Sequence, residues 1–323
     1  MSAEERNSGT NFDARTIEES NELHKGASIG YPAMNMRTPG LILAMSLALG
    51  SLAAAGCGDK SQKESIVLAN EAVDAANQGN ISEAEELLEK ATATYRDNHN
   101  AWYNLGQIRD QMKEFETAAE AYSEAARVKD DDAMYHYKLG KAYWNAKNIS
   151  SAESSLERAV QLNKRLYNAQ YHLGLVYEKQ GKPKEAAEAW TAAAALAPTF
   201  GKPFNDLGVL YIKWDKLTEA ISVLDQGRLN VRDGDDLTNI YYNLGLAYGK
   251  KGNWDKAIEA YSNAIQTRNT NLDALRQRGF AYAEKGDNEN ATKDLKAFVD
   301  QGGSGNAFHI QAANQRLFSL STP

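Results

Sequence analysis

The sequence predicts an all-α solenoid, in which pairs of short helices stack one after another along the chain. A Leu-Gly pair recurs at steps of 34, 34, 34 and 37 residues, and alanines recur in phase with it. Because such a chain distributes its hydrophobic core along an array, we expect it to act by presenting a long surface. The pairs are Leu105-Gly106, Leu139-Gly140, Leu173-Gly174, Leu207-Gly208 and Leu244-Gly245, then Arg278-Gly279; the alanines are Ala84, Ala118, Ala152, Ala186, Ala220, Ala257 and Ala291.

Each unit contains two amphipathic helices, as residues 99–132 illustrate. Trp102 and Ile108 belong to an apolar stripe at helical spacing in the first half of the unit. Ala118 and Tyr122 begin a second stripe in the other half. Only a tight turn fits between the two halves, so the helices run antiparallel. Neither helix can bury its stripe alone, and stacking of neighbouring units completes the core.

These units resemble the tetratricopeptide repeat family, whose pattern is W-x2-L-G-x2-Y, then A-x3-F/Y-x2-A, then P. Residue types and period agree with the pattern together, although only Pro198 keeps the closing proline. The resemblance implies a right-handed superhelical solenoid whose first helices line the concave face. The tyrosine that follows Leu-Gly is present in four units and replaced by arginine in one: Tyr143, Tyr177, Tyr211 and Tyr248, against Arg109.

We count about seven repeats over residues 65–305. The two outer units deviate from the pattern, as terminal repeats do when one face meets solvent. A last amphipathic stretch within 306–323 predicts a capping helix and tail. The single 37-residue step comes from an insertion near Asp233–Asp236, which we interpret as an acidic, solvated turn because a calcium loop would need a later bidentate glutamate. The predicted units are 65–98, 99–132, 133–166, 167–200, 201–237, 238–271 and 272–305.

The segment before the array resembles the signal of a bacterial lipoprotein. No charged residue occurs from Thr38 to Gly58, and a short apolar run ends in Ala54-Ala55-Gly56-Cys57. In such proteins the cysteine receives a diacylglyceryl group and signal peptidase cuts before it, leaving acyl chains such as palmitate on the mature N-terminus. The single cysteine excludes an intramolecular disulfide. We therefore expect lipidation at Cys57 and a short lipidated linker over 57–64.

Residues 1–33 do not fit a signal peptide. The first 36 residues carry six acids against three bases, whereas a signal peptide begins with positive charge. A start at Met34 or Met36 gives a signal peptide of normal length over 34–56, so we interpret 1–33 as a disordered, misannotated extension. The alternative is an acidic cytoplasmic tail on one membrane span, which would need about 20 solidly apolar residues. The expected location is the periplasm-facing surface of the bacterial envelope, at the outer rather than the inner membrane.

The candidate binding surface follows from the resemblance, which assigns it to the first helix of each repeat. A row of tyrosines with neighbouring amides and charges suits an extended or helical peptide. The same tyrosines could equally pack between adjacent first helices. A clamp for two carboxylates is not expected, because the corresponding positions hold mixed residue types. The candidates are Tyr103, Asn104, Gln107, Tyr137, Lys138, Lys141, Tyr171, His172, Asn205, Tyr242 and Asn243.

The composition and motifs argue against other functions. The formal net charge of −7 gives no support for nucleic-acid binding. No nucleophile elbow, phosphate loop or HExxH motif occurs, and His136 and His172 fall at different positions of successive helices, so we expect no catalysis, cofactor or metal. The prediction is a non-catalytic envelope adaptor that binds a partner protein or peptide. Alternatives are a pilotin-like chaperone lipoprotein for type IV pilus secretin assembly and a self-associating structural spacer.

Overall fold

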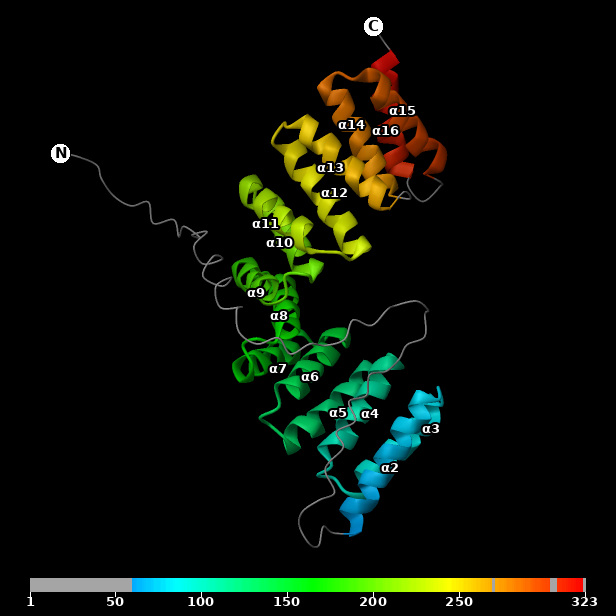
Figure 1. Ribbon diagram of the computed structural model, residues 1–323, viewed down its shortest axis with the longest axis vertical. Coiled ribbons are helices and arrows are strands. Elements are labelled where there is room, and N and C mark those ends of the chain that lie inside the picture. Colours follow the sequence, from blue (N-terminus) through cyan, green and yellow to red (C-terminus); the bar gives the residue numbers. More distant parts are fainter. Residues whose placement is uncertain (1–59, 269–270, 303–306, 322–323) are drawn as a thin grey trace, which may run out of the picture. The chain divides into compact units, whose positions relative to one another are not determined.

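The computed structural model describes residues 60–268, 271–302 and 307–321. All elements in these ranges are helices, in agreement with the predicted all-α class (Figure 1). They are α2 (Lys60–Asn77), α3 (Ile81–Thr94), α4 (His99–Gln111), α5 (Phe115–Val128), α6 (Ala133–Asn145), α7 (Ile149–Leu162), α8 (Tyr167–Lys179), α9 (Pro183–Leu196), α10 (Gly201–Lys213), α11 (Leu217–Asn230), α12 (Gly234–Lys250), α13 (Trp254–Thr267), α14 (Leu272–Lys285), α15 (Asn288–Gln301) and α16 (Ala307–Ser321).

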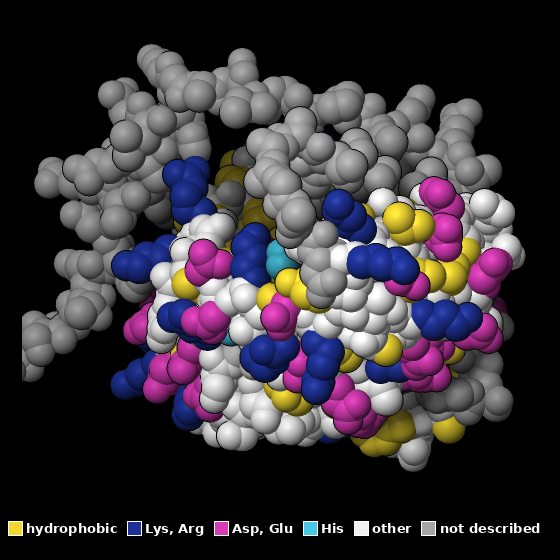
Figure 2. Space-filling view, turned by 90° about the horizontal axis from the view of Figure 1, so that it is seen from below, with side chains coloured by type: hydrophobic (Ala, Val, Ile, Leu, Met, Phe, Trp, Pro, Cys, Tyr) yellow, Lys and Arg dark blue, Asp and Glu magenta, His cyan; other side chains and the backbone are white. Residues whose placement is uncertain are grey.

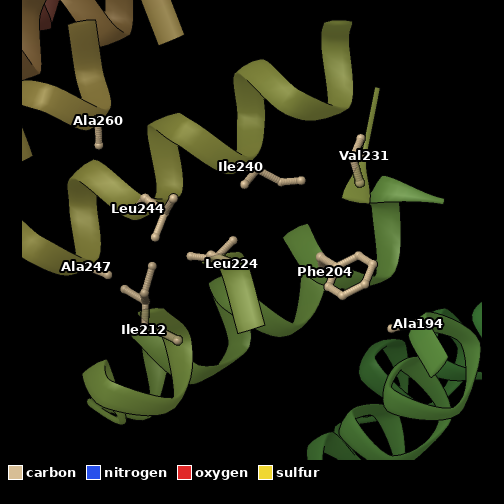
Figure 3. Close-up of a cluster of buried hydrophobic side chains, with 10 residues drawn as sticks. Ala194, Phe204, Ile212, Leu224, Val231, Ile240, Leu244, Ala247 and Ala260 are labelled. Carbon is tan, nitrogen blue, oxygen red and sulfur yellow. The ribbon is translucent and has the colours of Figure 1, made fainter. Parts of the chain in front are cut away.

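The helices pack in the order in which they occur along the chain. Each first helix packs on the second helix of its own repeat, and each second helix packs on the first helix of the next. The final helix, α16, packs on α15 and α14, where the sequence predicts a capping helix. The buried clusters therefore span repeats: the cluster in Figure 3 takes Phe204 from α10, Leu224 from α11 and Ile240 from α12. At the C-terminal end the cluster around Phe298 joins the last repeat to α16 instead.

The glycine of each Leu-Gly pair lies where the two helices of a repeat come closest. A Cβ atom built on Gly106 would lie 2.6 Å from the ring of Tyr122, and one on Gly174 would fall inside the indole of Trp190. Real Cβ contacts are not this short, so a hydrogen atom is required here. The facing side chain is fully buried in both repeats. The other pairs are Gly140 with Leu156, Gly208 with Leu224, Gly245 with Tyr261 and Gly279 with Leu295.

The turn inside each repeat passes through one left-handed residue. These residues follow the same spacing as the Leu-Gly pairs, with a single step of 37 residues among steps of 34. Four are glycines, whereas Lys113, Lys147 and Asp215 adopt the conformation with φ near 60°. A non-glycine residue pays about 1–2 kcal/mol for this backbone conformation, so helix packing must impose the turn. The seven residues are Gly79, Lys113, Lys147, Gly181, Asp215, Gly252 and Gly286.

The three-residue insertion is helical, which corrects the predicted solvated turn. Asp233 caps α12 by accepting hydrogen bonds from the Asp235 and Asp236 amides, and α12 has 17 residues where α10 has 13. The added turn packs on the start of α10: Asn205 Nδ2 donates to the Asp236 carbonyl at 3.2 Å, and a Cβ on Gly201 would lie 2.5 Å from Asp236. The repeat boundary predicted after residue 237 therefore falls inside a helix.

The first repeat also begins earlier than predicted. Helix α2 starts at Lys60, so the linker predicted over 57–64 is helical from that residue on. Cys57 and the predicted signal peptide lie outside the described residues. Within the described part of the chain, no helix combines the length and apolarity needed to cross a bilayer.

Two departures from the family pattern carry ion pairs between helices. Arg109, which replaces the patterned tyrosine, bonds Glu85 and Glu89 of α3 at 2.9 and 2.6 Å. Arg278, which replaces the leucine of Leu-Gly, bonds both oxygens of buried Asp294 at 2.6 and 2.9 Å. Such a bidentate pair keeps the buried carboxylate satisfied. The irregular last repeat is thus held by a charge pair where the others use apolar contact.

We expect Gly174→Ala to destabilise the array, because the added methyl group overlaps Trp190. Overpacking of this kind costs about 1–3 kcal/mol, which circular dichroism would record as a lower melting temperature. Gly249→Ala is the matched control, since its Cβ would meet nothing closer than 3.5 Å. Alanine is favoured over glycine in helices by about 1 kcal/mol, so this variant should melt at the same or a higher temperature. Equal losses in both variants would contradict the close-contact interpretation.

Candidate functional site

The candidate residues lie on α4, α6, α8, α10 and α12, the first helices of five consecutive repeats. Their tyrosines pack mainly between helices. The ring of Tyr103 lies 5.0 Å from that of Tyr135, and the ring of Tyr171 lies 5.1 Å from that of Phe200, centroid to centroid. Tyr137 and Tyr171 are 7% and 9% exposed. The sequence left open whether these tyrosines pack or bind a partner. The structure shows packing for Tyr137 and Tyr171, and their role in binding stays a prediction.

Burial of the rings also makes their hydroxyls harder to ionise. It raises the pKa of Tyr103 and of Tyr137 to about 12. The ring of Tyr242 packs against that of Tyr261, with 6.0 Å between the centroids, and burial raises the pKa of Tyr242 as well. These tyrosines therefore remain neutral hydrogen-bonding groups at ordinary pH.

The three asparagines of the candidate set are buried, each 8% exposed. Asn205 and Asn243 bond internally: Asn243 Nδ2 donates to Asn205 Oδ1 at 3.4 Å, and Asn205 Nδ2 donates to the Asp236 carbonyl. These bonds connect α10 to α12, and they occupy amide groups that the sequence predicts to bind a partner peptide. Asn104 is buried on α4. The amides thus act largely within the array.

Basic side chains of three successive first helices meet around His172. Its Nδ1–H donates to the Asn168 carbonyl oxygen at 2.8 Å, and its ring packs edge-on against that of Tyr137, with 5.5 Å between the centroids. Burial lowers the pKa of His172, and the nearby charges of Lys141, Lys202 and Lys138 lower it further. Together Lys138, Lys141, His172 and Lys202 form what we call the basic cluster.

The lysines of the basic cluster differ in their partners. Lys141 pairs with Asp110 of α4 at 3.2 Å. Lys138 is only partly exposed and forms no ion pair with any residue in the described ranges. Burial lowers its pKa and the neighbouring Lys141 adds to this effect, whereas the negative charge of Asp110 opposes it. The cluster therefore holds positive charge that the protein itself leaves incompletely neutralised.

Asp206 of α10 borders the basic cluster and was not among the candidates. Burial raises the pKa of its carboxyl group to about 6, against an opposing hydrogen bond from Tyr171. Its Oδ2 atom is buried and has no hydrogen-bond partner among the described residues. Repeat register could have found it, because Lys138, His172 and Asp206 occupy the same position of three consecutive repeats. Lys202 and Asp110 were also missed from the sequence, because the candidates are residues in and beside the row of tyrosines and these two lie outside that row.

Figure 2 shows charged side chains of both signs on one face of the molecule. Lysine and arginine side chains alternate there with aspartate and glutamate side chains. In the described ranges no group of three histidine, cysteine or acidic side chains is arranged to hold a metal ion.

Two sequence profiles of the tetratricopeptide repeat match the chain, one over residues 238–271 and the other over 70–135 and 137–199. The chain belongs to the tetratricopeptide repeat family. The matched ranges fall on helix pairs described above. Tetratricopeptide repeats form protein–protein interaction scaffolds, and that class of function applies to this chain.

Individual relatives are distant. Human "Protein O-mannosyl-transferase TMTC3" is 22% identical over 238 residues, covering 67% of this chain and 25% of that protein. "Cytochrome c-type biogenesis protein CycH" of Bradyrhizobium diazoefficiens is 27% identical, covering 61% of this chain and 59% of that protein. The chain thus spans from a quarter to three fifths of these relatives. The solved structure of Pseudomonas aeruginosa PilF superposes with a TM-score of 0.54 at 17% identity, covering 70% of this chain and all of PilF, which shows the shared fold.

The unusual carboxyl group of Asp206 predicts a stability difference that depends on pH. Its folded pKa of about 6 lies above the unfolded value of about 3.9, so the folded state holds the proton more tightly. Wild-type stability should therefore fall as pH rises from 4 to 7, by roughly 1–2 kcal/mol relative to Asp206→Asn. Urea unfolding at several pH values measures this difference. Asp74→Asn, an exposed acid on α2, is the control, and an identical pH trend in both variants would contradict the prediction.

Proposed function

We propose that this protein is a non-catalytic assembly adaptor that holds a segment of a partner protein along its first helices. The observation that carries the proposal is unmet hydrogen-bonding capacity on that surface. Five buried side-chain atoms have no partner within the described part of the chain, and three of them, Gln107 Oε1, Asp206 Oδ2 and Arg276 Nε, lie on the first helices α4, α10 and α14. The other two are Tyr122 Oη on α5 and Gln180 Oε1 at the end of α8. Buried polar atoms without partners are uncommon in native proteins and costly, and a bound peptide supplies both donors and acceptors.

Site-specific photo-cross-linking tests this proposal. A benzophenone side chain replaces Gln107 or Leu175 on first helices, in the full chain and in its own cells. Glu120 and Glu188, exposed on the second helices α5 and α9, are the matched controls. We expect one cross-linked partner from the first-helix positions and none from the controls. Cross-links confined to the second helices would place the binding surface on the opposite face and overturn the proposal.

We propose further that the adaptor is a lipoprotein of the bacterial cell envelope, anchored through Cys57 and facing the periplasm, at the outer rather than the inner membrane. The support is the uncharged segment that ends in Ala54-Ala55-Gly56-Cys57. A pilotin-like chaperone for secretin assembly is a narrower version of the same proposal and differs only in naming the partner. A self-associating spacer would replace the partner with a second copy, which sedimentation of the full chain at increasing concentration would reveal.

Mass spectrometry of the mature protein tests the anchor. We expect an N-terminus at Cys57 that carries a diacylglyceryl group, because the motif places the cleavage directly before this residue. Cys57→Ser should abolish both the lipid mass and the cleavage, since the modified cysteine directs the peptidase. An unmodified chain that begins at Met1 would contradict the lipoprotein proposal and the interpretation of residues 1–33.

A further inference from the structure

The basic cluster is unusual because the protein pairs most of its other half-buried bases. Arg109 bonds two glutamates, Arg278 bonds Asp294, and Lys182 bonds Glu153 at 2.7 Å. Lys138, in contrast, is largely withdrawn from water and has no carboxylate within ion-pair distance in the described ranges. An unpaired buried charge costs free energy unless a partner neutralises it. The free protein carries this cost, and binding of an anion would remove it.

The charges around the cluster leave it positive. Lys138 and Lys141 come from α6, His172 from α8 and Lys202 from α10. Asp110 neutralises Lys141, and Asp206 lies near Lys202, but Lys138 keeps its charge. The whole chain is acidic, with a formal net charge of −7. A local positive site on an acidic protein selects a complementary partner rather than any polyanion.

We propose that the basic cluster binds the acidic side chains of an internal segment of the partner protein. This inference rests on the proposed adaptor function and names the chemistry of its ligand. The cations are spread over three consecutive first helices, which suits several carboxylates in succession along one chain. A single terminal carboxylate would need two donors converging on one point, whereas Lys141 is already committed to Asp110.

Asp206 sets the boundary of the site on the side of α10. Its carboxylate repels an acidic residue placed beyond Lys202 and, through Oδ2, accepts a hydrogen bond from a partner amide. The bound segment therefore carries its acids over α6, α8 and the start of α10, where Lys202 lies.

The test measures binding of defined peptides to the full chain by fluorescence anisotropy. The probe is a twelve-residue peptide of alternating Glu and Ala, blocked at both ends, and its control replaces every Glu with Gln. We expect the Glu peptide to bind at least about tenfold more tightly, a difference that weakens as salt screens the charges. Equal affinity for the two peptides would overturn the proposal. A third peptide carries Gln in place of Glu and a free terminal carboxylate. If it bound as tightly as the Glu peptide, the cluster would recognise a chain end, and the proposal of an internal acidic segment would be overturned.

Two triple variants with the same change in net charge distinguish binding at the basic cluster from attraction to the net charge of the whole protein. Lys138→Gln with Lys141→Gln and Lys202→Gln should lose the tenfold preference. Lys90→Gln with Lys184→Gln and Lys296→Gln, all exposed on second helices, should keep it within about twofold. Equal losses would reduce the effect to net charge and contradict the proposal, as would equally tight binding of a thymidine oligonucleotide to the wild-type chain.

His172 provides a readout that a purely structural role would not change. An anion bound beside it should raise the pKa of its imidazole, which NMR follows in the presence and absence of the Glu peptide. The groups that face it are Tyr137, Lys138 and Lys141 of α6, Tyr171 of α8 and Lys202 of α10. Affinity should accordingly increase as pH is lowered through the titration of this imidazole, and an unchanged imidazole pKa would place the peptide elsewhere.

The fate of the cross-linked partner distinguishes the two proposals. If the cross-links from first-helix positions persist in the triple variant of the cluster, the adaptor function stands and the acidic-segment inference fails. If they vanish in that variant but persist in the control triple variant, both are supported. If no first-helix position cross-links in the wild-type chain, the adaptor function itself fails.

Discussion

The contact between a glycine of the first helix and a large side chain of the second is the interaction on which the rest of this structure depends. Where Gly106 meets Tyr122, or Gly174 meets Trp190, the absence of a Cβ atom lets the facing ring occupy the centre of the repeat. That ring is then completely buried and supplies the core that a hairpin of two helices lacks. Close packing of the helices in turn forces the connecting chain through a left-handed residue, even where that residue is lysine or aspartate.

Stacking of these hairpins creates the candidate binding surface as a by-product of stability. Each first helix presents one side to the neighbouring repeat and a strip of residues away from it. Tyr137 and Tyr171 serve the first purpose, because their rings fill the space between successive repeats. The strip that remains holds the basic cluster and Asp206, whose charges are only partly matched within the protein. Binding chemistry is therefore concentrated in the polar residues beside the tyrosine row.

The candidate site could be predicted in position but only partly in composition. Repeat register placed Lys138, Lys141 and His172 correctly on first helices, because register depends only on counting along the chain. It could not show that Asn205 and Asn243 bond each other, since that bond depends on the extra turn of α12 that packs on α10. Nor could it show the burial of Asp206, which requires the neighbouring Tyr171 and the removal of water from between two helices.

The sequence by itself determined the helix pairs, their number and the family, because all three follow from the spacing of apolar and small residues within single helices. It also supplied a segment before the array that resembles a lipoprotein signal ending at Cys57, on which the anchor proposal rests. Only the tertiary structure decided that the insertion near Asp233 lengthens a helix and that Arg278 replaces an apolar contact with a buried ion pair. It also decided that Lys138 forms no ion pair within the described ranges. These features depend on which side chains of a different helix lie opposite, and a periodic pattern does not specify the opposite side chain.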